Sequence, residues 1–247
     1  LVIGRGMQLG VNFANDYSDF VRGADQRRVG PVRAASSGVI APEQVRLAAI
    51  AAFGVAALAG LFLSFATDWR LLVAGAACLV AGWLYTGGPR PYGYLGLGEL
   101  FVFVFFGLVA TLGTVYVEAG HVSLLAVLIG CAMGFLACAI LVLNNLRDLE
   151  SDLAAGKRTL ATRIGPRGTR WLLVVLACAA FTVPIVVLVL KLAGVTVMLV
   201  HFAIPIAAVP VRAAFAAKGG PALVQALKRM ATAELAFALL FTLGLFL

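Results

Sequence analysis

Long apolar stretches recur along this chain, and they constrain its fold more than any other feature. The hydrocarbon core of a bilayer is about 30 Å thick, so a helix that crosses it needs about 20 mainly apolar residues. Backbone polar groups find no water in that core, and helices satisfy them internally. Residues 1–18 form one such helix, and seven further spans are predicted at 46–66, 71–86, 97–117, 122–145, 171–191, 195–213 and 230–247. The predicted fold class is all-α, a polytopic transmembrane helical bundle.

The composition supports this prediction and excludes other classes. Of the 247 residues, 62% are hydrophobic and 12% are charged, which is far from the composition of a water-soluble domain. The net charge of +8 requires no nucleic-acid partner, because basic loops of a membrane protein account for it. The four cysteines lie in apolar runs without metal-ligand spacing, so neither a disulfide nor a zinc site is expected.

The Lys and Arg residues are divided unevenly between the loops. Short cytoplasmic loops of membrane proteins accumulate these residues. One set of alternate loops holds sixteen of them, and the other set holds only Arg70 and Lys191. We therefore expect a multi-pass protein of the inner cell membrane, with the long polar loops 19–45 and 146–170 on the cytoplasmic side.

Six of the eleven carboxylates fall in two clusters, each at the end of an apolar span. In the first cluster, polar residues recur every three or four positions, so they share one face of a helix. This polar stripe consists of Gln8, Asn12, Asn15, Asp16, Asp19 and Arg22. In the second cluster, Asn144, Asp148 and Asp152 are four residues apart, which predicts that they also share one helical face.

Aligned carboxylates beside basic residues are typical of a site for a metal-bridged diphosphate. Mg²⁺ prefers oxygen ligands and is usually held by a few carboxylates together with substrate phosphates. Arg and Lys side chains supply the positive charge that a departing diphosphate needs. The basic residues nearest to the two clusters are Arg22, Arg28, Lys157 and Arg158.

The alternative interpretation is that these residues form ordinary solvated ion pairs at helix ends. For any single residue this interpretation is the better one. An ionisable group near the bilayer costs about 1 kcal/mol or more, and up to about 3 kcal/mol at its centre. Two clusters that run back into apolar spans therefore indicate a cavity that the two polar loops share.

At these positions the sequence resembles the UbiA superfamily of intramembrane aromatic prenyltransferases. The NDxxD motif of that family stands here as Asn15, Asp16 and Asp19, and the DxxxD motif stands as Asp148 and Asp152. The strings around both motifs, and the stretch 85–107, are similar to the members that act on 1,4-dihydroxy-2-naphthoate in menaquinone biosynthesis. Asp25, the third acid of the first motif, lies six residues past Asp19 rather than four, so the resemblance does not define its role as a ligand.

The resemblance implies a site and a domain organisation. The expected catalytic and Mg²⁺-binding residues are Asp16, Asp19, Asp148 and Asp152. The candidate substrate-binding residues are Asn12, Asn15, Arg22, Asp25, Arg28, Tyr92, Asn144, Asn145, Arg147, Lys157 and Arg158. Residues 1–247 are expected to form one membrane domain; since the family usually has nine spans and eight are visible, a first helix is expected to be missing.

The resemblance also implies a reaction. A polyprenyl diphosphate ionises to an allylic cation, the dihydroxynaphthoate ring attacks at its carboxylated carbon, and loss of CO2 gives demethylmenaquinol. Two alternatives stay open: a family member with another aromatic acceptor, such as 4-hydroxybenzoate or a tetrapyrrole, and an ion-coupled transporter, because intramembrane acids also mark ion pathways. Tyr92 or Tyr94 is expected to line the acceptor pocket, and Glu99 either pairs with an Arg near the site or stabilises a helix N-terminus.

Overall fold

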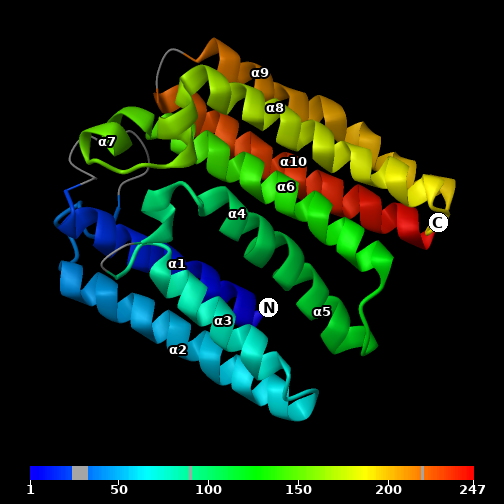
Figure 1. The fold of residues 1–247 in the computed structure, drawn as a ribbon, viewed down its shortest axis with the longest axis horizontal. Coiled ribbons are helices and arrows are strands. Elements are labelled where there is room, and N and C mark those ends of the chain that lie inside the picture. Colours follow the sequence, from blue (N-terminus) through cyan, green and yellow to red (C-terminus); the bar gives the residue numbers. More distant parts are fainter. Residues whose placement is uncertain (24–32, 89–90, 218–219) are drawn as a thin grey trace. The chain divides into compact units, whose positions relative to one another are not determined.

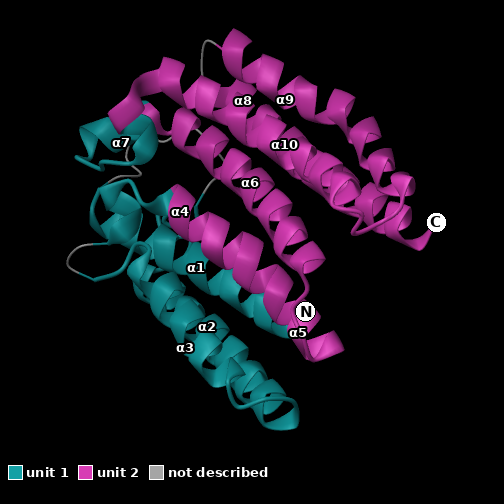
Figure 2. Cartoon of the chain, turned by 45° about the vertical axis from the view of Figure 1, so that its right-hand side comes forward, with its two compact units in different colours: residues 1–98, 150–162 teal, residues 99–149, 163–247 magenta. Residues whose placement is uncertain are grey.

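The structure is a computed structural model that describes residues 1–23, 33–88, 91–217 and 220–247. Helices make up every regular element in these residues, so the predicted all-α fold is confirmed. The chain divides into two compact units, shown in two colours in Figure 2. Unit 1 comprises Leu1–Gly98 and Glu150–Thr162, and unit 2 comprises Glu99–Leu149 and Arg163–Leu247. Each unit is described by itself.

Unit 1 is built around three helices that lie side by side (Figure 1). They are α1 (Val2–Val21), α2 (Pro42–Ala66) and α3 (Leu71–Leu84). Glycines allow α1 to approach its neighbours closely: a Cβ atom at Gly10 would lie 2.7 Å from the Phe53 ring. The unit also contains the short 3-10 helix η1 (Tyr92–Leu95) and most of α7 (Leu149–Ala154).

Unit 2 contains the larger apolar core. Its elements are most of α4 (Gly98–Val102), the π-helix η2 (Phe103–Val109), α5 (Ala110–Ala119), α6 (Leu124–Arg147), most of α8 (Leu160–Val189), the 3-10 helix η3 (Val195–Ala203), α9 (Ile204–Ala216) and α10 (Gly220–Phe246). Helix α10 packs against α6, η3 and α9. Large side chains that are fully buried, among them Leu136, Leu173, Met230 and Phe237, form the centre of this core.

Six described helical segments are long and apolar enough to cross a membrane, and they match six of the predicted spans. They are Pro42–Ala66, Gly98–Ala119, Leu124–Arg147, Leu160–Val189, Val195–Ala216 and Gly220–Phe246. The predicted span 71–86 corresponds to the shorter apolar helix α3, which has 14 residues. The predicted helix at 1–18 is present as α1, but it is not one of the six, because polar residues occupy one of its faces.

The contact between η2 and α6 is too close for side chains on both sides. A Cβ atom at Gly107 would lie 2.4 Å from the Cα of Gly134 and 2.8 Å from the carbonyl oxygen of Gly130. Both neighbours are backbone atoms, which a rotamer change cannot move. Small residues permit such close helix packing in membranes, where dispersion contacts and not the hydrophobic effect drive helix association.

The substitution Gly107→Ala is expected to destabilise the protein by about 1–3 kcal/mol, the usual cost of overpacking. The measurement is thermal unfolding of the purified protein in detergent, followed by circular dichroism. The matched control is Gly113→Ala in the same helical segment, where a Cβ atom would meet nothing within 4 Å. Equal melting temperatures for the two variants would contradict the close approach.

Candidate active site

The first acidic motif lies on the C-terminal half of α1, and both of its carboxylates are buried in unit 1. Asp16 is 7% exposed and Asp19 is 3% exposed. Asp16 Oδ2 accepts a hydrogen bond from the backbone N–H of Ala34 at 2.9 Å, and Oδ1 accepts one from Ala35 at 3.4 Å. Asp16 therefore anchors the segment that precedes α2 to α1.

Asp19 has several charged and polar partners in unit 1. Arg33 Nη1 donates to its Oδ2 at 3.0 Å, and the Tyr94 hydroxyl donates to its Oδ1 at 2.5 Å. Lys157 Nζ lies 3.5 Å from the same Oδ1. Three segments far apart in the sequence thus converge on one side chain, and the charge-assisted bonds offset the cost of burying it.

Lys157 joins the first acidic motif to the second within unit 1. Its Nζ lies 3.7 Å from Asp152 Oδ1 as well as 3.5 Å from Asp19. The backbone N–H of Lys157 donates to the carbonyl of Asp152 at 2.8 Å, after a turn in which Gly156 adopts a φ of 70°. The next residue, Arg158, donates its backbone N–H to the carbonyl of Tyr94 at 3.2 Å. The predicted convergence of polar loops is therefore present for Asp19, Asp152 and Lys157.

Tyr94 lies between two cations. The Arg22 guanidinium carbon and Lys157 Nζ each lie 4.8 Å from the centre of its ring, within range of a cation–π interaction. Burial raises the pKa of Tyr94, and the charge of Asp19 raises it further, whereas Arg22 lowers it. The net upward direction keeps the phenol protonated, so it stays a donor to Asp19.

Some of the predicted substrate-binding residues have other partners. The Tyr92 hydroxyl donates to the carbonyl of Ala81 at 2.7 Å, so the tyrosine beside the carboxylates is Tyr94. Asn12 is exposed and donates to the carbonyl of Gln8 at 2.8 Å. Asn15, with its amide oriented to satisfy both neighbours, donates to Asp19 Oδ2 and accepts from Arg33 Nη2, each at 3.2 Å.

Of the two arginines Arg22 and Arg33, only Arg22 was predicted from the sequence as a site residue. Arg22, a predicted site residue, donates Nη2 to the carbonyl of Gly88 at 2.7 Å. Arg33 was not predicted, and the sequence marks it only as one of several basic residues in the loop. The predicted Asp25 and Arg28 lie outside the described residues.

The prediction of one helical face for the second motif is wrong. Helix α6 ends at Arg147 and α7 begins at Leu149, with Asp148 between them at φ −92° and ψ 5°. Asp148 therefore caps α6 in unit 2, whereas Asp152 lies on α7 in unit 1. Arg147 pairs with Asp148 at this break: its Nε and Nη2 donate to the two oxygens of Asp148 at 2.7 and 2.5 Å.

The two asparagines of the second motif have different partners in unit 2. Asn144 Oδ1 accepts from Arg147 Nη2 at 2.8 Å. Asn145 Nδ2 donates to Glu99 Oε1 at 3.0 Å. The described side-chain partner of Glu99 is thus an amide, and of the two roles that the sequence left open, its place in the first turn of α4 fits the charge near a helix N-terminus.

The donor set in unit 1 fits a shared metal site better than an all-protein cage. Among the described residues, no group of three or more His, Cys, Asp or Glu side chains is placed to hold a metal by itself. Asp19 and Asp152 nevertheless present hard carboxylate oxygens from two segments, next to Arg and Lys side chains that suit a diphosphate. These carboxylate oxygens are of the type that Mg²⁺ prefers, so the residues present would fit that ion.

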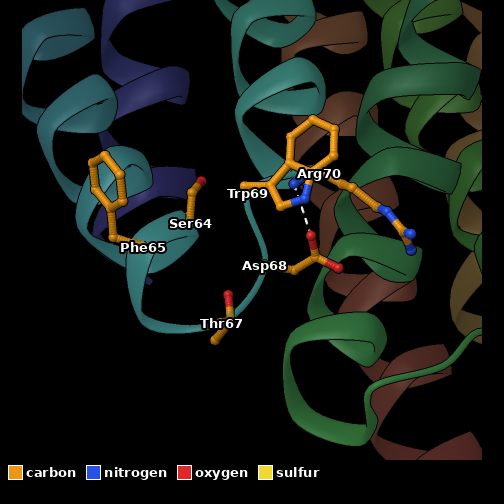
Figure 3. Close-up of a pocket in the computed structure, with 6 residues that line it drawn as sticks. All are labelled: Ser64, Phe65, Thr67, Asp68, Trp69 and Arg70. Atoms are coloured by element: carbon orange, nitrogen blue, oxygen red, sulfur yellow. Dashed lines mark hydrogen bonds between the residues drawn. The ribbon is translucent and has the colours of Figure 1, made fainter.

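A separate hollow of about 450 Å³ lies at the turn between α2 and α3 (Figure 3). It is lined by Ser64, Phe65, Thr67, Asp68, Trp69 and Arg70. The backbone N–H of Arg70 donates to Asp68 Oδ1 at 2.8 Å across the turn. None of the predicted site residues lines this hollow, so we do not assign it to the site.

The helical membrane fold and the paired acidic motifs define a class of protein. Residues 1–237 match the UbiA prenyltransferase family, and the chain belongs to that family. It is 49% identical to the 1,4-dihydroxy-2-naphthoate octaprenyltransferase of Mycobacterium tuberculosis (strain ATCC 25618 / H37Rv) over 172 residues, which are 70% of this chain and 59% of the relative.

Other bacterial relatives bear the same name. The protein of Mycobacterium leprae (strain TN) is 43% identical over 76% of this chain and 64% of its own length. The protein of Escherichia coli (strain K12) is 39% identical over 66% of this chain and 56% of its own length. The chain covers less than two thirds of the length of each of these three relatives.

Proposed function

We propose that this protein transfers a polyprenyl group from a polyprenyl diphosphate to 1,4-dihydroxy-2-naphthoate, with release of diphosphate and CO2. The product is a demethylmenaquinol, an intermediate of menaquinone biosynthesis. Family membership and the names of the relatives support prenyl transfer and this acceptor. The site faces the cytoplasm in this proposal, because the basic loops lie on that side under the charge bias of membrane proteins.

The main structural support for the proposal is the position of Lys157. Lys157 lies 3.5 Å from Asp19 of the first motif and 3.7 Å from Asp152 of the second, so residues of both motifs share one cation. A solvated ion pair at a helix end would not require partners 138 residues apart, yet Asp19 and Lys157 are both largely buried. Buried charges of this kind are costly and typically functional.

The residues of unit 1 have distinct tasks in this reaction. Asp19 and Asp152 would hold Mg²⁺, which neutralises charge on the diphosphate when bound. Lys157, Arg22 and Arg33 donate to the diphosphate oxygens as the bond from the allylic carbon to oxygen breaks and its electron pair leaves with the diphosphate. Tyr94 positions both charged side chains: its hydroxyl donates to Asp19, and its ring contacts the Lys157 ammonium group.

The apolar surroundings determine the fate of the allylic cation. Helices exclude water, which would otherwise capture the cation as an alcohol. The carboxylated ring carbon forms the new carbon–carbon bond, and the bond to the carboxylate then breaks. Its electrons return to the ring, which restores aromaticity and releases CO2.

A reconstituted assay tests the proposal. The purified chain is incubated in lipid nanodiscs with Mg²⁺, a labelled polyprenyl diphosphate and either 1,4-dihydroxy-2-naphthoate labelled at its carboxylate or 4-hydroxybenzoate. We expect a prenylated naphthalene diol and stoichiometric release of labelled CO2, with both lost in EDTA and restored by excess Mg²⁺.

Three outcomes would contradict this proposal in different ways. Product from hydroxybenzoate alone would identify another acceptor within the family. Full activity in EDTA would remove the role of Mg²⁺. Ion-driven uptake of a solute into liposomes without any prenylated product would favour a transporter.

A further inference from the structure

Glu99 is a half-buried acid in unit 2 that the proposed chemistry does not use. It lies in the first turn of the apolar segment Gly98–Ala119. Its Oε1 accepts a hydrogen bond from Asn145 Nδ2 at 3.0 Å, and its backbone carbonyl accepts one from the Cys138 thiol at 3.0 Å. Both partners lie on α6, so α6 fixes the position of Glu99 and of its carboxyl group.

The second oxygen of this carboxyl group has no such partner. Oε2 is buried, and none of the described residues donates a hydrogen bond to it. A buried acceptor without a donor costs about 1–3 kcal/mol, and more when it carries charge. Such atoms are rare in proteins, and a bound water, ion or ligand is what usually completes their hydrogen bonding.

The neighbours of Glu99 connect it to the second acidic motif. Asn145 follows Asn144, which binds Arg147, and Arg147 in turn holds Asp148 at the end of α6. Asn145 is itself only 8% exposed. The open oxygen of Glu99 therefore lies at the end of α6 that carries the motif, within the same unit.

The chemistry of Glu99 Oε2 determines which kind of group can bind to it. A carboxylate oxygen accepts hydrogen bonds from a hydroxyl and repels another carboxylate or a phosphate. In 1,4-dihydroxy-2-naphthoate, the hydroxyl at position 1 is next to the carboxylate and bonds to it internally. The hydroxyl at position 4 is free to donate to the protein.

We propose that Glu99 binds the 4-hydroxyl of the aromatic acceptor through Oε2 and is held in place for this by Asn145. This inference rests on the proposed function for the identity of the acceptor. Glu99 is assigned a role in acceptor binding and specificity, and no proton transfer is assigned to it. A site built to accept from a substrate hydroxyl discriminates strongly against an analogue that lacks it.

A ligand-and-variant cycle tests the inference by direct binding, without turnover. Affinities of the purified protein in nanodiscs are measured by calorimetry for 1,4-dihydroxy-2-naphthoate and for 1-hydroxy-2-naphthoate, which lacks the 4-hydroxyl. For the unmodified chain we expect the analogue to bind at least about tenfold more weakly, a difference equal to about 1.4 kcal/mol. For Glu99→Gln we expect weaker binding of the dihydroxy compound and a difference between the two compounds of less than about threefold.

Two controls separate a specific role from a structural one. In Glu99→Gln the remaining carbonyl oxygen still accepts from Asn145, so the melting temperature is expected to stay within a few degrees. Glu118→Gln makes the same chemical change at an exposed position of the same helical segment, and it should leave both affinities unchanged. The KM for polyprenyl diphosphate should be the same in all three proteins.

The results can fail in distinguishable ways. If Glu99→Gln still distinguishes the two compounds as the unmodified chain does, the inference is wrong even where prenyl transfer is normal. If the unmodified chain binds both compounds equally, the inference is also overturned. If it binds the dihydroxy compound with the expected discrimination but transfers no prenyl group, the proposed reaction falls and the binding role of Glu99 stands.

Discussion

The substitution Asp19→Asn is expected to lower kcat for prenyl transfer by about three orders of magnitude, the upper end of what one charge-stabilising group contributes. Asp19 is the meeting point of Arg33, Lys157 and Tyr94, and it supplies a carboxylate to the proposed Mg²⁺ site. The amide keeps the shape of the side chain but removes its charge, so Arg33 and Lys157 each lose one carboxylate partner. The measurement is single-turnover transfer of a labelled polyprenyl group over a range of Mg²⁺ concentrations.

The control for this variant is Glu150→Gln. Glu150 is an exposed acid two residues before Asp152, in the same unit as Asp19, and its loss should change kcat less than twofold. Because Asp19 is buried, the melting temperature of each variant must be recorded as well. A folded Asp19→Asn protein with kcat within tenfold of the unmodified chain would refute the role given to this carboxylate.

The second large effect is expected for Lys157→Met, which should lower kcat by about 100- to 1,000-fold. Methionine has nearly the same length and fills the space beside Tyr94, but it cannot donate to a diphosphate or join Asp19 to Asp152. Loss of the cation also leaves more negative charge at the proposed Mg²⁺ site, so the variant should need less Mg²⁺ to reach half-maximal rate. The rate and this Mg²⁺ requirement are read from the same transfer assay.

Two further variants serve as controls for Lys157→Met. Lys157→Arg keeps the charge in a different geometry, and we expect it to recover part of the rate. Lys228→Met removes an exposed lysine on α10, and its rate should match that of the unmodified chain. A Lys157→Met protein with an unchanged Mg²⁺ requirement would show that Lys157 does not belong to the metal and diphosphate site.

The spans were predictable because hydrophobicity over about 20 residues is a local property of the sequence. Helix α1 shows where that rule reaches its limit. Its polar stripe predicted correctly that Asp16 and Asp19 share a helix, but the same stripe makes the helix less apolar than the six clear spans. The close contact of Gly107 with α6 could not be predicted, because it depends on which helices become neighbours.

The site was predictable in its residue types but not in its connections. Spacing identified the aspartates, yet regular spacing also suggested a continuous helix through Asp148, where α6 instead ends with Asp148 as its C-cap, paired with Arg147. Arg33 carries no local signal, because its partner Asp19 is 14 residues away in the sequence. Tyr92 and Tyr94 are two residues apart in the same short helix, and only the fold determines that Tyr94 donates to Asp19 while Tyr92 donates to the carbonyl of Ala81.

The short length of α3 has a consequence for how a lipid substrate reaches the site. Its 14 residues rise only about 21 Å, roughly 9 Å less than the hydrocarbon core of a typical bilayer. Lipids beside a helix with this hydrophobic mismatch thin locally. The loop that follows α3 carries Tyr94, so for the proposed substrate such thinning would shorten the distance that the diphosphate headgroup travels while its isoprenoid tail stays in the membrane.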